Sequence, residues 1–210
     1  MIDSALLPMQ RSLMDPPARW LAARGVAADQ VTVTGFAIGL LAVFAIAWGL
    51  WSVGLVLILL NRLCDGLDGA LARRVGTTDR GAFLDIALDF AFYALVPVGV
   101  AFADPAANAL PAAVLIAAFV GTGSSFLAFS TIAAQKGLTA DAYPSKGIYY
   151  LGGLTEGFET IVFFILICLL PQYFAPMAYG FAAACALTTA IRWHQGWVAF
   201  GPQDTPHDKT

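Results

Sequence analysis

The stretch that decides the fold is DGLDGALARRVGTTDRGAFLDIALD, residues 65–89, in which two spaced pairs of carboxylates lie beside long apolar runs. Asp65 and Asp68 are three residues apart, and Asp85 and Asp89 are four apart, so each pair falls on one face of a helix. Ionised carboxylates beside apolar segments are costly unless they are paired, hydrated or bound to metal. Two such pairs on facing helices predict one or two divalent cations with oxygen ligands, Mg²⁺ or Mn²⁺.

The composition indicates a polytopic membrane protein of one domain. Of its 210 residues, 59% are hydrophobic and only 12% are charged, and the mean hydropathy of +0.75 lies outside the range of soluble proteins. Several apolar runs are long enough to cross a bilayer. We therefore expect an all-α protein with six transmembrane helices, at about 31–50, 52 into the motif, 82–102, 112–134, 151–170 and 173–193.

The connections between these spans carry their own signals. Asp29 is the expected N-cap of the first span. Asp104, Pro105, Asn108 and Pro111 predict a loop between the third and fourth spans.

The expected domain limits follow from these spans. Residues 1–28 predict a cytoplasmic segment with an interfacial amphipathic helix that places Trp20 at headgroup depth. Pro16 and Pro17 are expected to break any helix before Ala18. Residues 29–198 would form the six-helix domain, and 199–210 a disordered cytoplasmic tail.

The positive charges predict the orientation in the membrane. Each of the 11 Lys and Arg residues falls near a terminus, between spans two and three, or between spans four and five. By the positive-inside rule, both termini and the aspartates are expected on the cytoplasmic side, where nucleotides and Mg²⁺ are available. The short loops and Ala-rich composition fit a bacterial inner membrane.

Cations held at the four aspartates would coordinate a pyrophosphate and spread its negative charge. Arg73 lies between the two pairs and would bind a phosphate oxygen. Gly69 has no side chain, so a nucleotide could approach its backbone closely. A substrate hydroxyl must lose its proton as it attacks phosphorus, and a carboxylate is a suitable base.

The motif resembles the signature of the CDP-alcohol phosphotransferases, and the whole chain is similar to small bacterial members in length and hydropathy. That signature reads Asp, two residues, Asp-Gly, two, Ala-Arg, seven or eight, Gly, three, Asp, three, Asp. With seven residues between Arg73 and Gly81, every fixed position matches. The matching residues are Asp65, Asp68, Gly69, Ala72, Arg73, Gly81, Asp85 and Asp89.

The resemblance implies roles for these residues. Asp65, Asp68 and Asp85 would be metal ligands, and Asp89 would be both a ligand and the general base, with two metal ions per active site. The CDP part of the donor would contact Gly69, Ala72, Arg73 and Thr78. Residues Ala28, Asp29 and Gln30 match a further nucleotide-contacting stretch, with Ala28 where many relatives carry Pro. A homodimer is also implied.

A second polar group of residues points to the acceptor. Glu156 and Glu159 lie three residues apart at the start of the fifth span, where they predict either an acceptor site or a helix cap that complements the macrodipole. Similar proteins that use a phosphorylated polyol carry arginines in this region. Here only Lys146 and Arg192 could serve a phosphate, so we expect a neutral or amine-bearing alcohol, or the hydroxyl of another lipid.

Together these features predict a membrane transferase of phospholipid biosynthesis. It would move a phosphatidyl group from CDP-diacylglycerol to an alcohol acceptor and release CMP, in contact with membrane lipids and with no nucleic-acid partner. A choline- or ethanolamine-type CDP-aminoalcohol phosphotransferase acting on diacylglycerol is the alternative, and the motif does not decide between them. A cation transporter is disfavoured because the acids lie at span ends and no repeat is visible. A non-catalytic lipid-binding relative is disfavoured by the intact motif.

Overall fold

The computed structural model describes residues 13–137 and 153–201, and these are helical with no strand among them. This confirms the all-α class. The elements are a short N-terminal helix (residues 13–22), α2 (Ala28–Ala47), α3 (Trp51–Val75), α4 (Asp79–Ala103), α5 (Pro105–Gln135), α6 (Gly157–Leu169), the 3₁₀ turn η2 (Pro171–Tyr173) and α7 (Phe174–Ala199).

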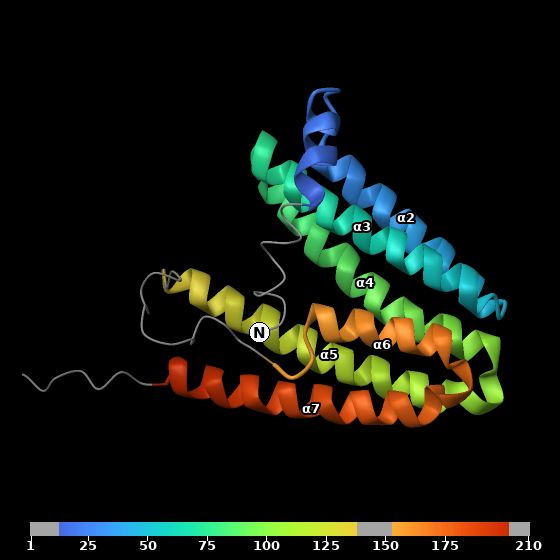
Figure 1. The fold of residues 1–210 in the computed structure, drawn as a ribbon. Coiled ribbons are helices and arrows are strands. Elements are labelled where there is room, and N and C mark those ends of the chain that lie inside the picture. Colours follow the sequence, from blue (N-terminus) through green and yellow to red (C-terminus); the bar gives the residue numbers. More distant parts are fainter. Residues whose placement is uncertain (1–12, 138–152, 202–210) are drawn as a thin grey trace, which may run out of the picture.

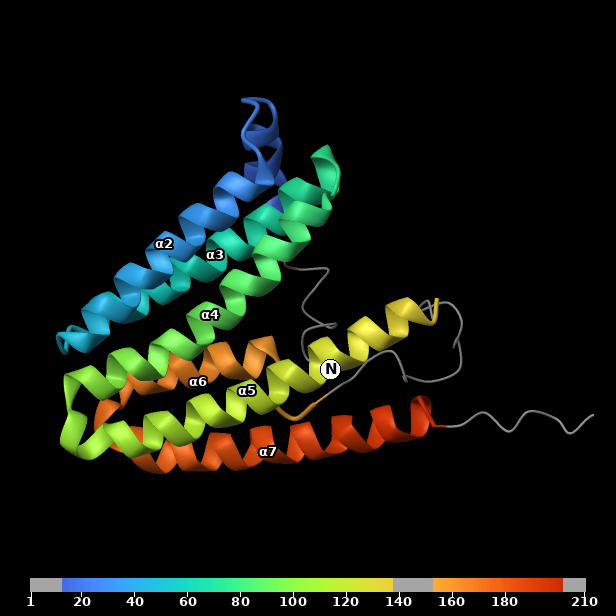
Figure 2. The ribbon, with the colours of Figure 1, turned by 180° about the vertical axis from the view of Figure 1, so that it is seen from behind.

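The helices form two groups joined through α4 (Figures 1 and 2). Helix α2 packs along both α3 and α4, and α5 packs along α4 and α7, while α6 contacts α3. The main core lies where the groups meet and is rich in aromatic rings. Phe92 of α4 and Phe119 of α5 both meet the ring of Phe164 of α6 edge to face, with centroids 6.0 and 6.4 Å away.

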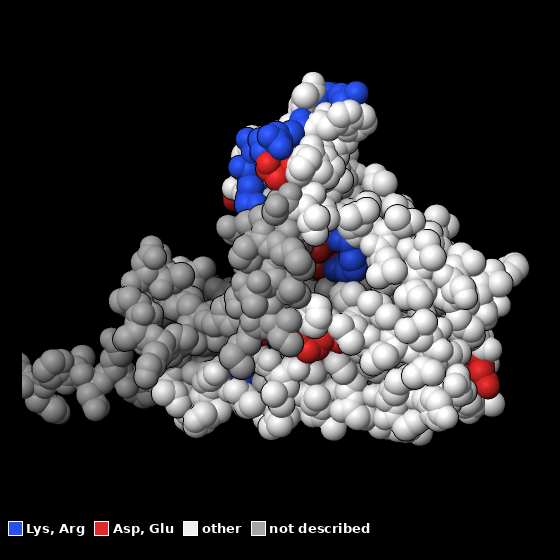
Figure 3. All heavy atoms as spheres, viewed as in Figure 1, with Lys and Arg blue, Asp and Glu red and all other residues white. Residues whose placement is uncertain are grey.

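Four segments are long and apolar enough to cross a membrane: α2, α4, α5 and the η2–α7 stretch Pro171–Ala199. Helix α6 is apolar but has only 13 residues, and α3 carries the charged motif. Large apolar side chains such as Phe44 and Trp48 are exposed on the outer surface, as expected where lipid replaces water. Charged side chains gather at the end formed by the N-terminal helix and in one recessed patch, while most of that face is uncharged (Figure 3).

The loop predicted around residues 104–111 is wrong, because α5 begins at Pro105 immediately after α4. Asp104 caps α5 by accepting a hydrogen bond from the Ala107 amide at 3.1 Å. Proline is well tolerated at the first helical position, where the amide has no partner in any case. The side chain of Asn108 is buried and donates to the Val100 carbonyl at 3.3 Å, which ties α5 to the end of α4.

Two expectations at the N-terminus are also wrong. The helix at 13–22 runs through Pro16 and Pro17, which lie near its start, where most amides lack an intrahelical acceptor. The N-cap of α2 is Ala27 rather than Asp29, and the Gln30 side chain accepts a hydrogen bond from the Ala27 amide at 3.1 Å. Asp29 lies in the first turn, where its charge complements the macrodipole.

The N-terminal helix is attached to the end of α3. Arg74 donates from Nε to Asp15 Oδ1 at 3.0 Å, and Ala18 is fully buried. The Arg74 hydrogen bond, with Arg74 and Arg19 charges nearby, lowers the pKa of Asp15 below its usual value. Trp20 is exposed, with the Arg24 guanidinium 3.5 Å above its ring. This arrangement leaves an aromatic and basic surface beside the ends of α2 and α3.

Candidate active site

A tight turn between α3 and α4 brings the two carboxylate pairs together. Helix α3 ends at Gly76, whose φ of 105° is a conformation that favours glycine, and α4 begins after Thr78. Thr78 is the N-cap of α4, and its Oγ1 accepts a hydrogen bond from the Gly81 amide at 3.0 Å. The helices leave this turn side by side, so the pair on α3 faces the pair on α4.

Asp65, Asp68 and Asp85 each offer one carboxylate oxygen, and these three oxygens lie within 4.8 Å of one another. Carboxylates this close together repel one another unless a counter-ion neutralises their charge. A set of ligands made only of oxygen atoms fits a hard divalent cation. Asp68 is buried and is oriented from a third helix: Thr32 Oγ1 of α2 donates to Asp68 Oδ2 at 2.6 Å. The residues present therefore fit the metal that the motif implies.

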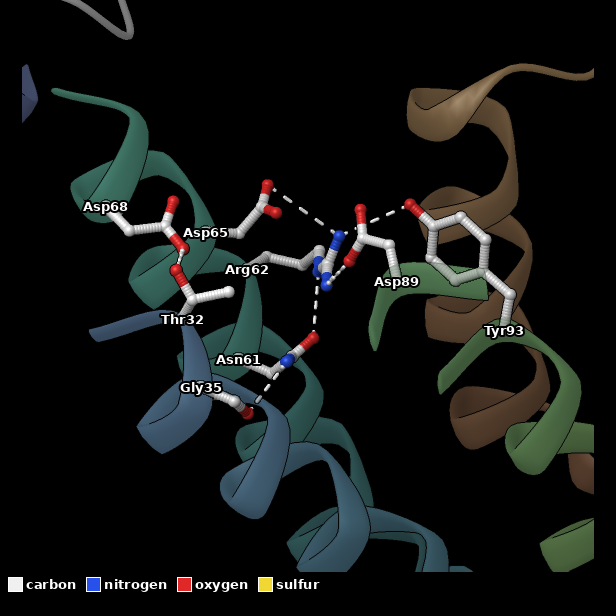
Figure 4. A network of polar contacts seen from close by, with 8 residues as sticks. All are labelled: Thr32, Gly35, Asn61, Arg62, Asp65, Asp68, Asp89 and Tyr93. Carbon is white, nitrogen blue, oxygen red and sulfur yellow. Dashed lines mark hydrogen bonds and ion pairs between the residues drawn. The ribbon is translucent and has the colours of Figure 1, made fainter. Parts of the chain in front are cut away.

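Asp89 lies beside this group but is bound to an arginine (Figure 4). Arg62 Nη2 donates to Asp89 Oδ1 at 2.8 Å, while Arg62 Nη1 lies 3.7 Å from Asp65 Oδ2. The guanidinium thus stands between the first and last aspartates of the motif. Of the four predicted ligands, three form the compact oxygen group and the fourth is held by a cation of the protein itself.

Arg62 is mostly buried and is fixed on several sides. Its Nε donates to Asn61 Oδ1 at 2.9 Å, and Asn61 Nδ2 donates to the Gly35 carbonyl of α2 at 2.8 Å. Its Nη1 also lies 3.3 Å from the hydroxyl of Tyr93. Sequence reasoning assigned Arg62 no role in the site, although a charged residue inside an apolar run and three positions before Asp65 is a signal that could have found it.

The residues expected to contact the donor nucleotide lie at the same end of the helices. Arg73 is exposed on α3, and a Cβ at Gly69 would lie 3.4 Å from its Nη1. Asp29, at the start of α2, forms an ion pair with Arg80 at the start of α4, with Nη2 and Oδ2 2.6 Å apart. The stretch Ala28–Gln30 and the Thr78 turn are therefore neighbours in space, although 50 positions separate them in sequence.

Gly81 also lies close to both of these segments. A Cβ at this position would lie 3.0 Å from Asp29 Oδ1 and 3.1 Å from Thr78 Oγ1. The glycine therefore lets the start of α2 approach the start of α4.

The predicted acceptor residues separate into different environments. Glu159 accepts a hydrogen bond from the Glu156 amide at 3.1 Å, which is the capping arrangement of α6. Glu156 accepts from the Gly153 amide at 3.0 Å and also lines a cavity together with Arg192. Lys146 lies outside the described residues.

That cavity has a volume of about 900 Å³ and lies between α4, α5, α7 and the start of α6. Tyr93 lines it, and the same Tyr93 accepts the contact from Arg62 beside Asp89. Tyr93 therefore contacts both the cavity and the arginine that holds Asp89. No sequence signal pointed to this cavity, because it is formed by faces of helices that are distant in the chain.

Comparisons with known proteins agree with this geometry. The family model for CDP-alcohol phosphatidyltransferase matches residues 25–198. The chain is 52% identical to the inner membrane protein YnjF of Escherichia coli (strain K12) over 198 residues, which covers 94% of this chain and 96% of that protein. It is 30% identical to an uncharacterized protein of Aquifex aeolicus (strain VF5) over 166 residues, covering 76% of each.

Solved structures share the fold. The phosphatidylinositol phosphate synthase PgsA1 of Mycobacterium tuberculosis with CDP-DAG bound superposes with a TM-score of 0.67 at 24% identity, covering 92% of this chain and all of that one. The same enzyme in complex with manganese and citrate gives a TM-score of 0.65 over 90% of this chain and 93% of that one. Since the family model spans most of the chain and the motif lies inside it, this protein belongs to the CDP-alcohol phosphatidyltransferase family.

Proposed function

We propose that this protein is an integral-membrane transferase that moves a phosphatidyl group from CDP-diacylglycerol to the hydroxyl of an alcohol and releases CMP. The observation that carries the proposal is the approach of Asp65, Asp68 and Asp85 to within 4.8 Å, with Asp89 beside them. The CDP-DAG bound to the PgsA1 structure supports this choice of donor.

Asp65, Asp68 and Asp85 would hold Mg²⁺ or Mn²⁺, two ions per site, with Asp89 at the edge of the group. When bound, the metal supplies Lewis-acid neutralisation of the donor's pyrophosphate. The protein's part is to fix the carboxylates, and the hydrogen bond from Thr32 to Asp68 does so from the neighbouring helix.

The donor's CDP group would lie where α2, α3 and α4 begin or end together. Arg73 would bind a phosphate oxygen, while Gly69 and Ala72 leave its side of α3 open to the nucleotide. Thr78 and the Ala28–Gln30 stretch would line the other side, since the Asp29–Arg80 ion pair holds them together. The diacylglycerol tails would extend between helices into the membrane.

Asp89 would act as the general base. The acceptor oxygen attacks the phosphorus that carries the diacylglycerol, its proton passes to Asp89, and the bond from that phosphorus to the bridging pyrophosphate oxygen breaks as CMP leaves. Arg62 would position Asp89, because its Nη2 holds one carboxylate oxygen and leaves the other to face the substrate. Held in this way, Asp89 would also keep the acceptor oxygen aligned with the phosphorus that it attacks.

The acceptor would enter the cavity beside Tyr93 and contact Glu156 and Arg192. Lys146 and Glu159 stay predictions from the sequence as acceptor-binding residues. The six helices α2–α7 would all cross a bacterial inner membrane, with both termini and the aspartates on the cytoplasmic side. A homodimer would be the working assembly. The inner-membrane name of the YnjF relative supports this location.

The test is CMP release from CDP-diacylglycerol by the purified full chain, with Mg²⁺ or Mn²⁺ and a panel of acceptors. The panel comprises glycerol 3-phosphate, inositol phosphate, serine, choline, ethanolamine, phosphatidylglycerol and monoacylglycerol. We expect metal-dependent release that Asp89→Asn abolishes and that the matched variant Asp104→Asn retains. Asp104 caps α5 and lies 15 residues along the helix from Asp89, roughly 22 Å away. Release that Asp89→Asn keeps would show that another group is the base.

The apolar cavity also favours a second candidate, the CDP-aminoalcohol reaction, in which diacylglycerol is the acceptor. The same assay with CDP-ethanolamine or CDP-choline as donor distinguishes the two. CMP release from these soluble donors with diacylglycerol, and none from CDP-diacylglycerol, would reverse the assignment of donor and acceptor.

A further inference from the structure

The cavity beside the carboxylate site has the size and lining of a lipid site. Its volume of about 900 Å³ lies at the upper end of the range of small-molecule pockets, which is much more than a three-carbon alcohol fills. Its walls are largely apolar side chains of α4 and α5, namely Phe83, Phe90, Phe119, Val120, Phe126 and Leu127. A ligand with a long apolar body would match these walls.

The charges in this cavity balance. Among its described lining residues only Glu156 and Arg192 are charged, one of each sign, and they interact electrostatically. Arg192 Nη1 donates to the Thr122 carbonyl at 3.1 Å, and its guanidinium lies 5.7 Å from the Phe126 ring centre. A phosphate monoester carries about two negative charges, and its burial here would lack a compensating excess of cations.

The cavity is joined to the reaction site by Tyr93. The Tyr93 ring lines the cavity, while its hydroxyl contacts Arg62, which holds Asp89. An alcohol in the cavity with its hydroxyl near Tyr93 would thus lie beside the residue that contacts Arg62, the arginine that holds the proposed base Asp89. The polar residues Thr160 and Glu156 line the same side, where they would contact the head of the molecule, and the apolar walls remain for its tail.

We infer that the acceptor is a lipid alcohol, a molecule with a hydroxyl head, an apolar body and no phosphate monoester. Uncharged acylglycerols and the glycerol hydroxyl of a phosphodiester lipid share this chemistry. The inference rests on the proposed function, because it names the acceptor of that reaction. Phosphorylated polyols such as inositol phosphate are excluded as acceptors.

The test is a series of 1-O-alkylglycerols of increasing chain length, from glycerol to octylglycerol, with CDP-diacylglycerol as donor. If the chain enters the cavity, kcat/KM should rise about fourfold for each added methylene, equivalent to ~0.8 kcal/mol, until the cavity is filled. Phosphatidylglycerol and monoacylglycerol, tested separately, distinguish the two sources of lipid hydroxyl. A flat series, or faster transfer to glycerol 3-phosphate than to octylglycerol, overturns the inference.

Two variants distinguish binding of the alkyl chain in the cavity from its general partitioning into detergent. Val120→Trp adds bulk at a cavity wall, and Leu110→Trp adds the same bulk at an exposed position of α5 away from the cavity. We expect Val120→Trp to flatten the chain-length series, so that octylglycerol loses its advantage over glycerol, and Leu110→Trp to leave the series unchanged. If Val120→Trp instead raises the KM for CDP-diacylglycerol and leaves the series intact, the cavity holds the donor's acyl chain and the inference is wrong.

A binding measurement without turnover tests this inference even if the proposed reaction is wrong. The thermal unfolding temperature is measured with octylglycerol or glycerol 3-phosphate and no donor. Stabilisation by octylglycerol that Val120→Trp removes and Leu110→Trp keeps supports a lipid-alcohol site, even if no donor yields CMP. Stabilisation by glycerol 3-phosphate alone, or by neither compound, overturns it.

Discussion

Arg62 of α3 donates from Nη2 to Oδ1 of Asp89 on α4 at 2.8 Å, and this contact joins the proposed base to the aspartates that we propose bind metal. Arg62 is itself anchored by Asn61, whose amide binds the Gly35 carbonyl of α2. Three helices thus determine where one carboxylate of the motif points. A base must lie within hydrogen-bond reach of the proton it takes, so under the proposed mechanism the arginine would act on catalysis through the position of Asp89.

Replacing Arg62 by Met should lower kcat by about 10²-fold, because Asp89 loses the group that orients it. Arg62→Lys should recover part of this loss, since it keeps one charged donor without the planar fork. The KM for CDP-diacylglycerol should change little, because Arg62 faces the base rather than the nucleotide end. These values come from initial rates of CMP release.

The control for Arg62 is Arg24→Met, which removes a guanidinium that stacks on Trp20 at the surface. Arg24→Met should have the same kcat, and the same KM for CDP-diacylglycerol, as the unchanged protein. Wild-type kcat in Arg62→Met would show that Asp89 holds its position without the arginine. Equal losses in the Met and Lys variants would indicate a structural rather than a positioning role.

The hydrogen bond from Thr32 to Asp68 gives a test of the metal site that does not depend on turnover. Thr32→Val removes a 2.6 Å contact to a carboxylate of the three-residue group and should weaken Mn²⁺ binding about 10- to 100-fold. Thr34→Val is the matched control, because Thr34 Oγ1 bonds only the Gln30 carbonyl of its own helix. Mn²⁺ titration followed by electron paramagnetic resonance measures the Mn²⁺ affinity of both variants. Equal affinities in the two variants would show that the hydrogen bond from Thr32 does not support metal binding.

The spacing of the aspartates was enough to predict that their carboxylates gather. Two pairs at helical spacing, joined by a short turn that contains Gly76, allow Asp65 and Asp68 to lie close to Asp85, as the structure has them. The partner of Asp89 depends on how α3 and α4 are rotated about their axes. That rotation is determined by packing against α2, which a local pattern does not contain.

The errors at prolines have a related origin. Pro105 and Pro111 are typical of loops, yet both lie in α5 because Asp104 caps the helix and buried Asn108 bonds the preceding one. The apolar cavity could not be predicted from the sequence for a similar reason. Its walls come from α4, α5 and α7, so no contiguous stretch of sequence describes it.

Gly81→Ala should raise the KM for CDP-diacylglycerol about tenfold, which corresponds to ~1.4 kcal/mol of donor binding. The added Cβ would lie 3.0 Å from Asp29 Oδ1 and 3.1 Å from Thr78 Oγ1, so these two side chains at the proposed nucleotide end would have to shift by a few tenths of an ångström. Gly180→Ala is the control, because a Cβ there meets no atom within 4 Å. An unchanged KM in Gly81→Ala would place the nucleotide elsewhere.

The Asp15–Arg74 contact predicts how the N-terminal helix responds to pH. Because the pKa of Asp15 is lowered in the folded protein, the contact contributes stability above the unfolded pKa near 3.8 and loses it as the pH falls through the lower folded value. Amides of residues 13–22 should therefore be protected from hydrogen exchange at neutral pH and lose protection below about pH 4. Asp15→Asn should remove this pH dependence. Protection that is independent of pH in the unchanged protein would contradict the prediction.

Glu156→Gln should change which acceptor is used. The amide keeps an oxygen that can accept from the Gly153 amide, so the cap of α6 survives, but Arg192 loses the opposite charge in the cavity. The ratio of kcat/KM for glycerol 3-phosphate to that for monoacylglycerol should therefore rise about tenfold, while the KM for CDP-diacylglycerol stays the same. Glu159→Gln is the matched control, since Glu159 caps the same helix but does not line the cavity. An equal loss of donor and acceptor use in Glu156→Gln would mean that this carboxylate supports the fold rather than the acceptor. An unchanged ratio would mean that the charge on Arg192 does not affect binding of the acceptor.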